Sequence, residues 1–353
     1  MDAVPTLTTP EALAAAGLID DTHATALRAV AARYAVAVPP ALHHLIRATG
    51  RDGPLAKQFV PSALELITAP EERSDPIGDH THAPLRGIVH RYPDRVLLLP
   101  THACAVYCRF CFRREVVGPE GGTLSAADLD NALAYIAATP AIFEVILTGG
   151  DPLVLSPRRL GEIVARLDTI PHVQVIRVHT RVPIAAPERI TAETVAALKR
   201  TTKAVYVGVH CNHAAELTAE VRAACARLAD AGLALISQSV LLRGVNDSLE
   251  ALETLMRALL AARIKPYYLH QLDLAPGTSH FRVPLDEGQA LVKALRGRLS
   301  GLAQPTYILD IPGGAGKVPV ATPWLGQDAD GRTVVSDPSG REHIYPPPAS
   351  AET

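Results

Sequence analysis

The sequence has few of the bulky residues that often dominate a core, with one Trp, two Met and five Phe among 353 residues. Hydrophobic residues still make up 48% of the chain, so we expect a sizeable core built from Val, Leu, Ile and Ala. The chain also has no large excess of either charge, because its 34 Lys and Arg residues are nearly matched by 36 Asp and Glu residues. This balance argues against a protein that coats nucleic acid.

Long apolar runs are absent as well. No stretch reaches the roughly 18 apolar residues that a membrane-spanning helix requires. The first residues, MDAVPTLTTPEALAAAG, carry no basic leader and no continuous apolar segment, so a secretory signal is not expected. We therefore predict a cytoplasmic protein that has neither a membrane nor a nucleic acid as its partner.

Cysteine is scarce, but three of the five cysteines, Cys104, Cys108 and Cys111, stand together in a C-x3-C-x2-C spacing. Such clustering indicates metal or redox chemistry rather than a disulfide framework. A structural zinc site needs four ligands, and no second cysteine pair is present, so zinc would require a residue such as His102. Three thiolates on an iron–sulfur cubane with one open iron explain the count directly. Three unrelated buried thiols are the remaining alternative.

The hydrophobic pattern changes along the chain. Residues 1–88 carry apolar residues at three- and four-residue spacing, which predicts a helical N-terminal extension. Short runs of Val, Ile, Leu and Tyr then alternate with amphipathic stretches, as in parallel βαβ units. The predicted strands cover 95–100, 143–149, 173–180, 204–210, 233–241 and 265–272, and the predicted helices lie near 125–138, 156–168, 191–200, 214–231, 247–262 and 285–299. A further extended piece at 305–312, a small hairpin and a frayed end follow them.

Polar or reactive residues follow the end of every predicted strand. A barrel of alternating strands and helices collects its active site at these ends, whereas an open doubly wound sheet concentrates it at one switch point. All six strand ends are used in this way, so the sequence favours a partial barrel of the TIM type. The residues concerned are Cys104, Gly149, Gly150, Asp151, His179, Arg181, His210, Gln238, His270 and Asp273.

The stretch DIPGGAGKVP, residues 310–319, looks superficially like a phosphate-binding P-loop. A P-loop requires G-x4-G-K-[ST] at the start of a helix, whereas Val318 and Pro319 follow Lys317 here. Lys317 is therefore predicted to lie on a glycine-rich arm, where its amine could bind an aldehyde cofactor such as pyridoxal phosphate. A solvent-exposed loop lysine is the alternative.

The cysteine motif, with Tyr107 before the middle cysteine, resembles that of the radical S-adenosylmethionine family. Residues 87–317 are similar to the lysine 2,3-aminomutase branch of that family. The matching segments are HRYPDRVLLL (90–99), CAVYCRFCFRR (104–114), LTGGDPL (147–153), QSVLLRGVND (238–247), PYYLHQLDL (266–274), HFRVP (280–284) and DIPGGAGK (310–317).

This resemblance implies an α/β fold, namely a partial (β/α)6 radical S-adenosylmethionine barrel at residues 89–303. An N-terminal helical extension would occupy residues 1–88, and a C-terminal arm and tail would occupy residues 304–353. The resemblance also implies a [4Fe–4S] cluster on Cys104, Cys108 and Cys111. Its open iron would bind S-adenosylmethionine, and reduction by a donor such as flavodoxin or ferredoxin would release a 5′-deoxyadenosyl radical.

The resemblance further assigns residues to the two organic cofactors. Lys317 is predicted to carry pyridoxal phosphate and to be the catalytic lysine. The phosphate of that cofactor would be bound by Arg91 and Arg95, with Arg181 as a less secure addition. The residues implied around S-adenosylmethionine are Gly149, Gly150, Asp151, His210 and Gln238.

Three charged residues are implied to select the substrate. Arg113 matches the arginine that holds the substrate carboxylate, and Asp273 and Asp310 match the acidic pair that holds the distal ammonium of lysine. Two carboxylates suit a cationic side chain because a buried charge needs partners. The predicted enzyme is an isomerase that moves the α-amino group of L-lysine to the β-carbon and gives β-lysine. The alternatives are the same chemistry dedicated to elongation factor P, an arginine 2,3-aminomutase, and a radical enzyme that shares only the cluster.

The chain departs from the family pattern at two points. No cysteine follows Cys225, so the C-terminal zinc site of longer members is not expected, and a homo-oligomer is left open. His270 stands where a tyrosine is expected, so one contact near the pyridoxal phosphate is predicted to differ.

Overall fold

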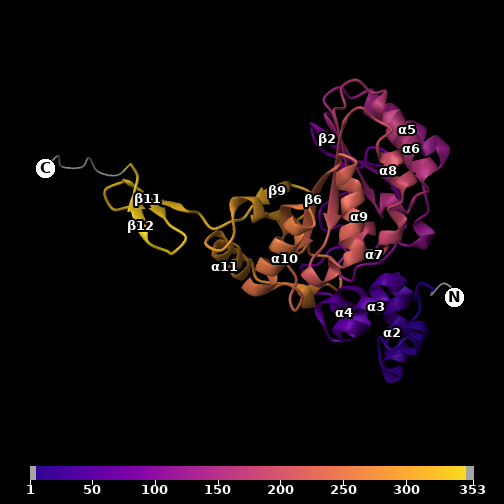
Figure 1. The fold of residues 1–353 in the computed structure, drawn as a ribbon, viewed down its shortest axis with the longest axis horizontal. Coiled ribbons are helices and arrows are strands. Elements are labelled where there is room, and N and C mark those ends of the chain that lie inside the picture. Colours follow the sequence, from indigo (N-terminus) through magenta and orange to yellow (C-terminus); the bar gives the residue numbers. More distant parts are fainter. Residues whose placement is uncertain (1–4, 347–353) are drawn as a thin grey trace.

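The computed structural model describes residues 5–346, and its N-terminal part is helical as predicted. These helices lie together at one end of the molecule, below the barrel in Figure 1. Proline begins three of them, where a missing N–H costs nothing because the first N–H groups of a helix have no partner within the helix. They are α1 (Pro10–Ala15), α2 (Asp21–Arg33), α3 (Pro40–Thr49) and α4 (Pro54–Phe59).

Nine strands form one sheet in which spatial order follows chain order. Strands β2 to β8 run parallel, and β1 and β9 pair antiparallel at the two edges. Within the described residues β1 and β9 do not pair with each other, so the barrel stays incomplete, and the predicted partial barrel is confirmed. The strands are β1 (Ile88–Tyr92), β2 (Arg95–Thr101), β3 (Glu144–Gly149), β4 (Val175–Thr180), β5 (Ala204–His210), β6 (Ala234–Val240), β7 (Lys265–His270), β8 (Thr306–Ile311) and β9 (Gly316–Pro319).

Helices connect the parallel strands, and most of them begin at a capping hydroxyl. The side chains of Ser125, Ser156, Thr191, Thr218 and Ser248 each accept a hydrogen bond from a backbone N–H in the first turn. The helices are α5 (Ala126–Ala137), α6 (Pro157–Asp168), α7 (Val182–Ala185), α8 (Ala192–Leu198), α9 (Ala219–Asp230), α10 (Leu249–Ala261) and α11 (Leu285–Arg296).

The six strands and six helices expected from the sequence pattern are all present. The extended piece at 305–312 is the parallel strand β8, which pairs with β7 through Tyr268 and Thr306. The sequence pattern predicts it only as an extended piece after the last helix and not as a barrel strand. The sheet therefore continues into β8 and β9, and the division of the chain at residue 304 stays an interpretation of the sequence.

The core is aliphatic, as the composition indicates. Leu98, Val145 and Val178, on consecutive strands, are fully buried together with Leu and Ile residues of the surrounding helices. No helix among residues 5–346 combines the length and the apolar character that crossing a membrane would demand. The cytoplasmic location stays a prediction.

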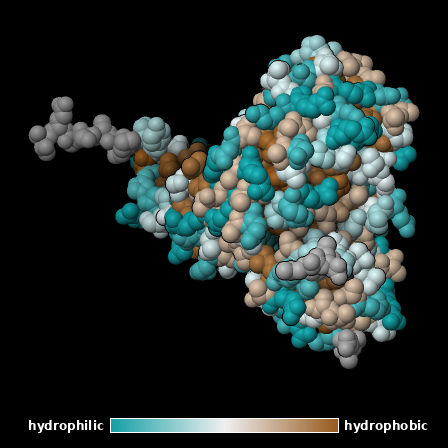
Figure 2. All heavy atoms as spheres, turned by 45° about the vertical axis from the view of Figure 1, so that its right-hand side comes forward, coloured by the Kyte–Doolittle hydropathy of each residue, from teal (hydrophilic) through white to brown (hydrophobic). Residues whose placement is uncertain are grey.

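A small antiparallel sheet follows the barrel and projects away from it (Figure 1). It contains β10 (Leu325–Gln327), β11 (Thr333–Ser336) and β12 (Glu342–Ile344), so the predicted hairpin is confirmed and gains a third strand. Figure 2 shows hydrophobic residues on this sheet, where Leu325 is exposed. The predicted frayed end falls at 347–353, outside the described residues.

One buried carboxylate joins the N-terminal extension to the loop that carries the cysteines. Glu65 is fully buried and accepts hydrogen bonds from Arg109 at 2.6 Å and from Arg114. The backbone N–H of Arg109 also donates to the carbonyl of Gln58 at 2.8 Å. Because Arg109 and Arg114 flank Cys111 in the sequence, these contacts fix the path of the cysteine loop.

Replacing Glu65 with Ala should leave two buried guanidinium groups without their carboxylate. We expect the free energy of unfolding to fall by about 3–5 kcal/mol, as is usual when one partner of a buried ion pair is removed. Urea unfolding followed by circular dichroism would measure this loss. The control is Glu11→Ala, because Glu11 pairs with Arg28 at the surface and its loss should change little. Equal effects of the two substitutions would contradict the role assigned to Glu65.

Candidate active site

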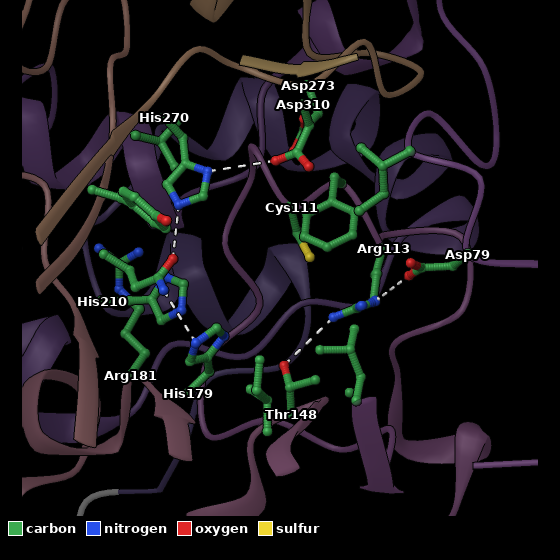
Figure 3. A pocket seen from close by; sticks show the side chains of 18 of the residues that line it. Asp79, Cys111, Arg113, Thr148, His179, Arg181, His210, His270, Asp273 and Asp310 are labelled. Atoms are coloured by element: carbon green, nitrogen blue, oxygen red, sulfur yellow. Dashed lines mark hydrogen bonds and ion pairs between the residues drawn. The ribbon is translucent and has the colours of Figure 1, made fainter. Parts of the chain in front are cut away.

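A cavity of about 430 Å³ runs through the barrel, from the first residues of β2 and β3 to the loops that follow these strands (Figure 3). Its volume lies in the range that suits a small molecule or cofactor. Every site residue predicted from the sequence lines this cavity, although these residues come from segments far apart in the chain. They are Arg91, Arg95, Cys104, Cys108, Cys111, Arg113, Gly149, Gly150, Asp151, Arg181, His210, Gln238, Asp273, Asp310 and Lys317.

The three clustered cysteines lie on the loop that follows β2. All three thiols are largely buried, and burial raises the pKa of each of them, that of Cys111 to about 11. No group of three or more His, Cys, Asp or Glu side chains in residues 5–346 is arranged to hold one metal ion. A cubane binds each thiolate through a different iron, so its ligands need not converge on one point. The predicted cluster therefore does not require the three thiols to converge.

Two glycines let the end of β3 lie against the cysteine loop. Gly149 has a φ of +112°, which favours glycine, and a Cβ at Gly150 would lie 2.2 Å from the carbonyl oxygen of Ala103. The N–H of Gly150 donates to the carbonyl of Thr101 at 2.7 Å. These contacts explain why glycine is needed here, and the predicted contact with S-adenosylmethionine stays a prediction.

Hydrogen bonds to the Asp151 side chain connect the end of β3 with the end of β4. Its carboxylate accepts hydrogen bonds from the Thr180 hydroxyl at 2.7 Å and from the backbone N–H groups of Arg181 and Val182, at 2.7 and 3.1 Å. A fourth hydrogen bond comes from the N–H of Leu153 at 3.0 Å. The carboxylate therefore accepts its hydrogen bonds from the protein itself, although Asp151 also lines the cavity.

Arg181 lies on the cysteine side of the cavity. Its Nη1 donates to Cys108 Sγ at 3.4 Å, and its Nη2 pairs with Glu216 at 2.6 Å and with Gln58 at 2.7 Å. The sequence grouped Arg181 with Arg91 and Arg95 at a phosphate. Arg181 contacts Cys108, Glu216 and Gln58 in this structure, and its part in binding a phosphate stays a prediction.

Lys317 lies on the edge strand β9, directly opposite Asp310 of β8. Its ammonium contacts the Asp310 carboxylate, and its backbone N–H donates to the Tyr92 hydroxyl at 2.7 Å. Arg91 lies 3.5 Å from the same carboxylate, and Arg95 stacks on the Tyr92 ring at 3.7 Å. The amine and both arginines therefore line the same cavity as the cysteines.

Asp273 and Asp310 have opposite protonation behaviour. Burial and the charge of Asp310 raise the pKa of Asp273 to about 7. Burial opposes ionisation of Asp310 too, but the contacts with His270 and Lys317 outweigh it and hold the pKa of Asp310 at about 2. One end of the cavity thus carries one firmly ionised carboxylate and one that takes up a proton near neutral pH.

Asp79 is a cavity residue that sequence reasoning missed. Its carboxylate accepts from Arg113 Nε at 2.8 Å and lies 3.3 Å from Arg91. It belongs to a loop that also touches the glycine arm, because the N–H of Gly313 donates to the carbonyl of Pro76 at 3.0 Å. The local sequence gives no signal for this role, since an acidic residue in a polar loop is normally solvated.

A chain of polar side chains crosses the cavity (Figure 3). Gln238 lies 3.1 Å from His179 Nε2 and 2.7 Å from His270 Nε2, and His270 Nδ1 lies 3.7 Å from Asp310. Burial lowers the pKa of all three cavity histidines, and with the charge of Arg181 it lowers that of His210 to about 3. The histidines are therefore neutral at physiological pH.

An incomplete barrel with three cysteines after its first parallel strand defines a radical S-adenosylmethionine protein. Residues 98–257 match the family model described as the Radical SAM superfamily, and residues 292–352 match the model described as Lysine-2,3-aminomutase. The predicted [4Fe–4S] cluster and S-adenosylmethionine follow from the first match.

The chain is also similar to curated proteins over most of its length. It is 41% identical over 313 residues to the L-lysine 2,3-aminomutase of Clostridium subterminale, which covers 89% of this chain and 75% of that protein. The L-lysine 2,3-aminomutase of Methanococcus maripaludis is 38% identical over 86% of this chain and 70% of its own length. The glutamate 2,3-aminomutase of Clostridioides difficile is 37% identical over 85% of this chain and 70% of its own length. This chain belongs to the lysine 2,3-aminomutase family, and the prediction of an isomerase is confirmed.

The raised pKa of Asp273 should make stability depend on pH. Between about pH 4, the usual carboxyl value, and pH 7 the folded chain binds a proton that the unfolded chain has released. The free energy of unfolding should therefore fall as pH rises through this window. Asp273→Asn removes this dependence, so the stability of the variant relative to the wild type should rise between about pH 4 and pH 7, by up to about 1.4 kcal/mol per pH unit.

Urea unfolding at several pH values would measure this difference. Asp330→Asn serves as the control because Asp330 is exposed, and its curve should parallel that of the wild type. Parallel curves for Asp273→Asn as well would contradict the assignment.

Proposed function

We propose that the protein is a pyridoxal phosphate-dependent lysine 2,3-aminomutase that moves the α-amino group of L-lysine to the β-carbon and yields β-lysine. The observation that carries this proposal is the pair of carboxylates, the partly buried Asp273 and the buried Asp310, which line one cavity together with Lys317 and the cluster cysteines.

The acidic pair suits a primary ammonium group. Asp310 already binds one, the side chain of Lys317, which has the same end group as a lysine substrate. Asp273 has no Lys, Arg or His within ion-pair distance in residues 5–346, and the cost of its buried charge appears as its raised pKa. A second cation at this end of the cavity would remove that cost. We therefore assign the distal ammonium of the substrate to the Asp273 and Asp310 pair.

The carboxylate of the substrate requires a positively charged partner, and Arg113 supplies it. Asp79 engages Arg113 through Nε, and Nη1 lies 3.5 Å from the Thr148 hydroxyl. This leaves the outer edge of the guanidinium, which matches a carboxylate in two-point geometry, available to a bound amino acid. Arg113 would hold the substrate carboxylate while Asp79 fixes the direction of its side chain.

The residues near Lys317 also fit pyridoxal phosphate. Arg91 Nε is buried without a hydrogen-bond partner in the described part of the chain, and Arg95 is partly open to the cavity. Lys317 would hold the cofactor covalently, and Arg91 and Arg95 would bind its phosphate. When bound, the cofactor supplies an aldehyde for the amino group and a conjugated ring that spreads unpaired spin. The cluster with S-adenosylmethionine supplies the group that abstracts hydrogen.

Other substrates are weighed by charge. Glutamate would place a third carboxylate beside Asp273 and Asp310, which costs energy unless protons or cations compensate. Arginine has the required positive charge, so it ranks second. Delivery of β-lysine to elongation factor P would use the same chemistry. A flavodoxin or ferredoxin is the proposed electron donor.

The test is anaerobic turnover of lysine, arginine and glutamate by the reconstituted and reduced enzyme, with chromatographic separation of the β-isomers. We expect lysine to be the preferred substrate, and we expect Asp273→Asn to raise the KM for lysine about tenfold or more because a charged contact is worth roughly 1.5–3 kcal/mol. Asp330→Asn should behave like the wild type. Turnover of glutamate alone would overturn the substrate assignment.

Lys317→Ala should abolish covalent attachment of pyridoxal phosphate. In wild-type protein the attached cofactor should give an absorption band that survives gel filtration, and borohydride should fix it to Lys317. The control is Lys199→Ala, because Lys199 is exposed at the end of α8. A band of wild-type intensity in Lys317→Ala would refute the assignment.

A further inference from the structure

His270 sits where two polar networks of the cavity meet. It ends β7, its side chain is only 15% exposed, and its two ring nitrogens face different partners. Nε2 is 2.7 Å from Gln238 Oε1, and Nδ1 is 3.7 Å from Asp310 Oδ2 (Figure 3). The imidazole thus connects Gln238 on β6 with the carboxylate that binds Lys317.

The direction of the Gln238 amide fixes the tautomer of His270. The amide nitrogen faces His179 Nε2 at 3.1 Å, and the amide oxygen faces His270. An amide oxygen only accepts hydrogen bonds, so Nε2 of His270 must carry hydrogen. In the neutral ring Nδ1 then has a lone pair, and this lone pair is directed toward Asp310.

Three groups therefore meet at one carboxylate oxygen. Asp310 Oδ2 contacts the Lys317 ammonium and is the oxygen nearest to His270 Nδ1. A lone pair beside a carboxylate is unfavourable, whereas an imidazolium there would form an ion pair. Burial lowers the pKa of His270, which leaves the ring neutral and able to accept a proton.

We propose that His270 accepts, through Asp310, the proton that Lys317 must lose before its amine can bind an aldehyde. One N–H bond of the ammonium breaks and one N–H bond forms at Nδ1, and no group is oxidised or reduced. The resulting imidazolium is neutralised by Asp310 and keeps its Nε2 hydrogen bond to Gln238. The proton returns when Lys317 is released. This inference rests on the pyridoxal phosphate part of the proposed function.

Among the described residues His270 is the only histidine within ion-pair distance of Asp310. Gln238 cannot hold a proton, and neither His179 nor His210 pairs with Asp310 or Lys317 in that part of the chain. A tyrosine, the residue expected here from the family pattern, would be a donor at neutral pH and could not take the proton. The titratable and charged groups that line the cavity around His270 are Tyr267, Tyr268, Arg91, Arg113, Arg177, His179, His210, Asp273, Asp310 and Lys317.

The test follows attachment of pyridoxal phosphate to the cofactor-free protein by stopped-flow absorbance between pH 6.5 and 9.5. His270→Gln can still donate an amide N–H to Gln238 but has no basic nitrogen. We expect attachment at pH 7 to slow about a hundredfold, the lower range for acid–base assistance, and to approach the wild-type rate at pH 9.5, where the higher hydroxide concentration replaces the missing base. His270→Asn, which also lacks a basic nitrogen, is a second variant in case His270→Gln does not fold.

The control is His172→Gln, because His172 also hydrogen-bonds through Nε2, to Ile136 O at 3.0 Å, but lies outside the cavity. It should match the wild type at every pH. An unchanged rate in both His270 variants, or the same slowing at every pH, would overturn the proton role and leave the cofactor assignment intact. Absence of any attached cofactor in wild-type protein would instead overturn the proposed function, and this inference with it.

Discussion

Charges at the mouth of the barrel are largely shielded from water, so each must be balanced by a neighbour. Glu216 balances Arg181, and Asp79 balances Arg113. Asp310 is shared among Lys317, Arg91 and His270. Asp273 has no basic residue within ion-pair distance among the described residues, and burial and the charge of Asp310 raise its pKa to about 7. The proposed substrate preference depends on this unpaired carboxylate.

Much of the fold could be predicted because parallel strands and amphipathic helices leave clear periodic patterns. Once a barrel was inferred, residues that follow strands had to share one rim, and for this reason Cys104, Gly150 and Asp273 could be placed together from sequence alone. The strand β8 was harder to recognise as part of the barrel, since it is followed by an edge strand rather than by a helix.

Side-chain partnerships were less accessible to prediction. Asp79 reaches Arg113 across 34 positions of the chain, and no local motif marks an acidic loop residue for that contact. The direction of the Arg181 side chain is likewise set by Glu216 and Gln58, which belong to other elements. The partner of such a side chain depends on which residues lie near it in three dimensions, and a strand pattern does not specify these neighbours.

Lys317 and Asp310 are register partners on adjacent antiparallel strands, so their side chains project from the same face of the sheet. Successive residues of a strand alternate between faces, and a slip of a single position in β9 would point the lysine out of the barrel. The turn between β8 and β9, residues 312–315, is what fixes that alignment. The length of this turn therefore decides which face of β9 carries Lys317, so an insertion or deletion must preserve the alternation of faces. The space around the glycines limits such changes further, although the turn itself performs no chemistry.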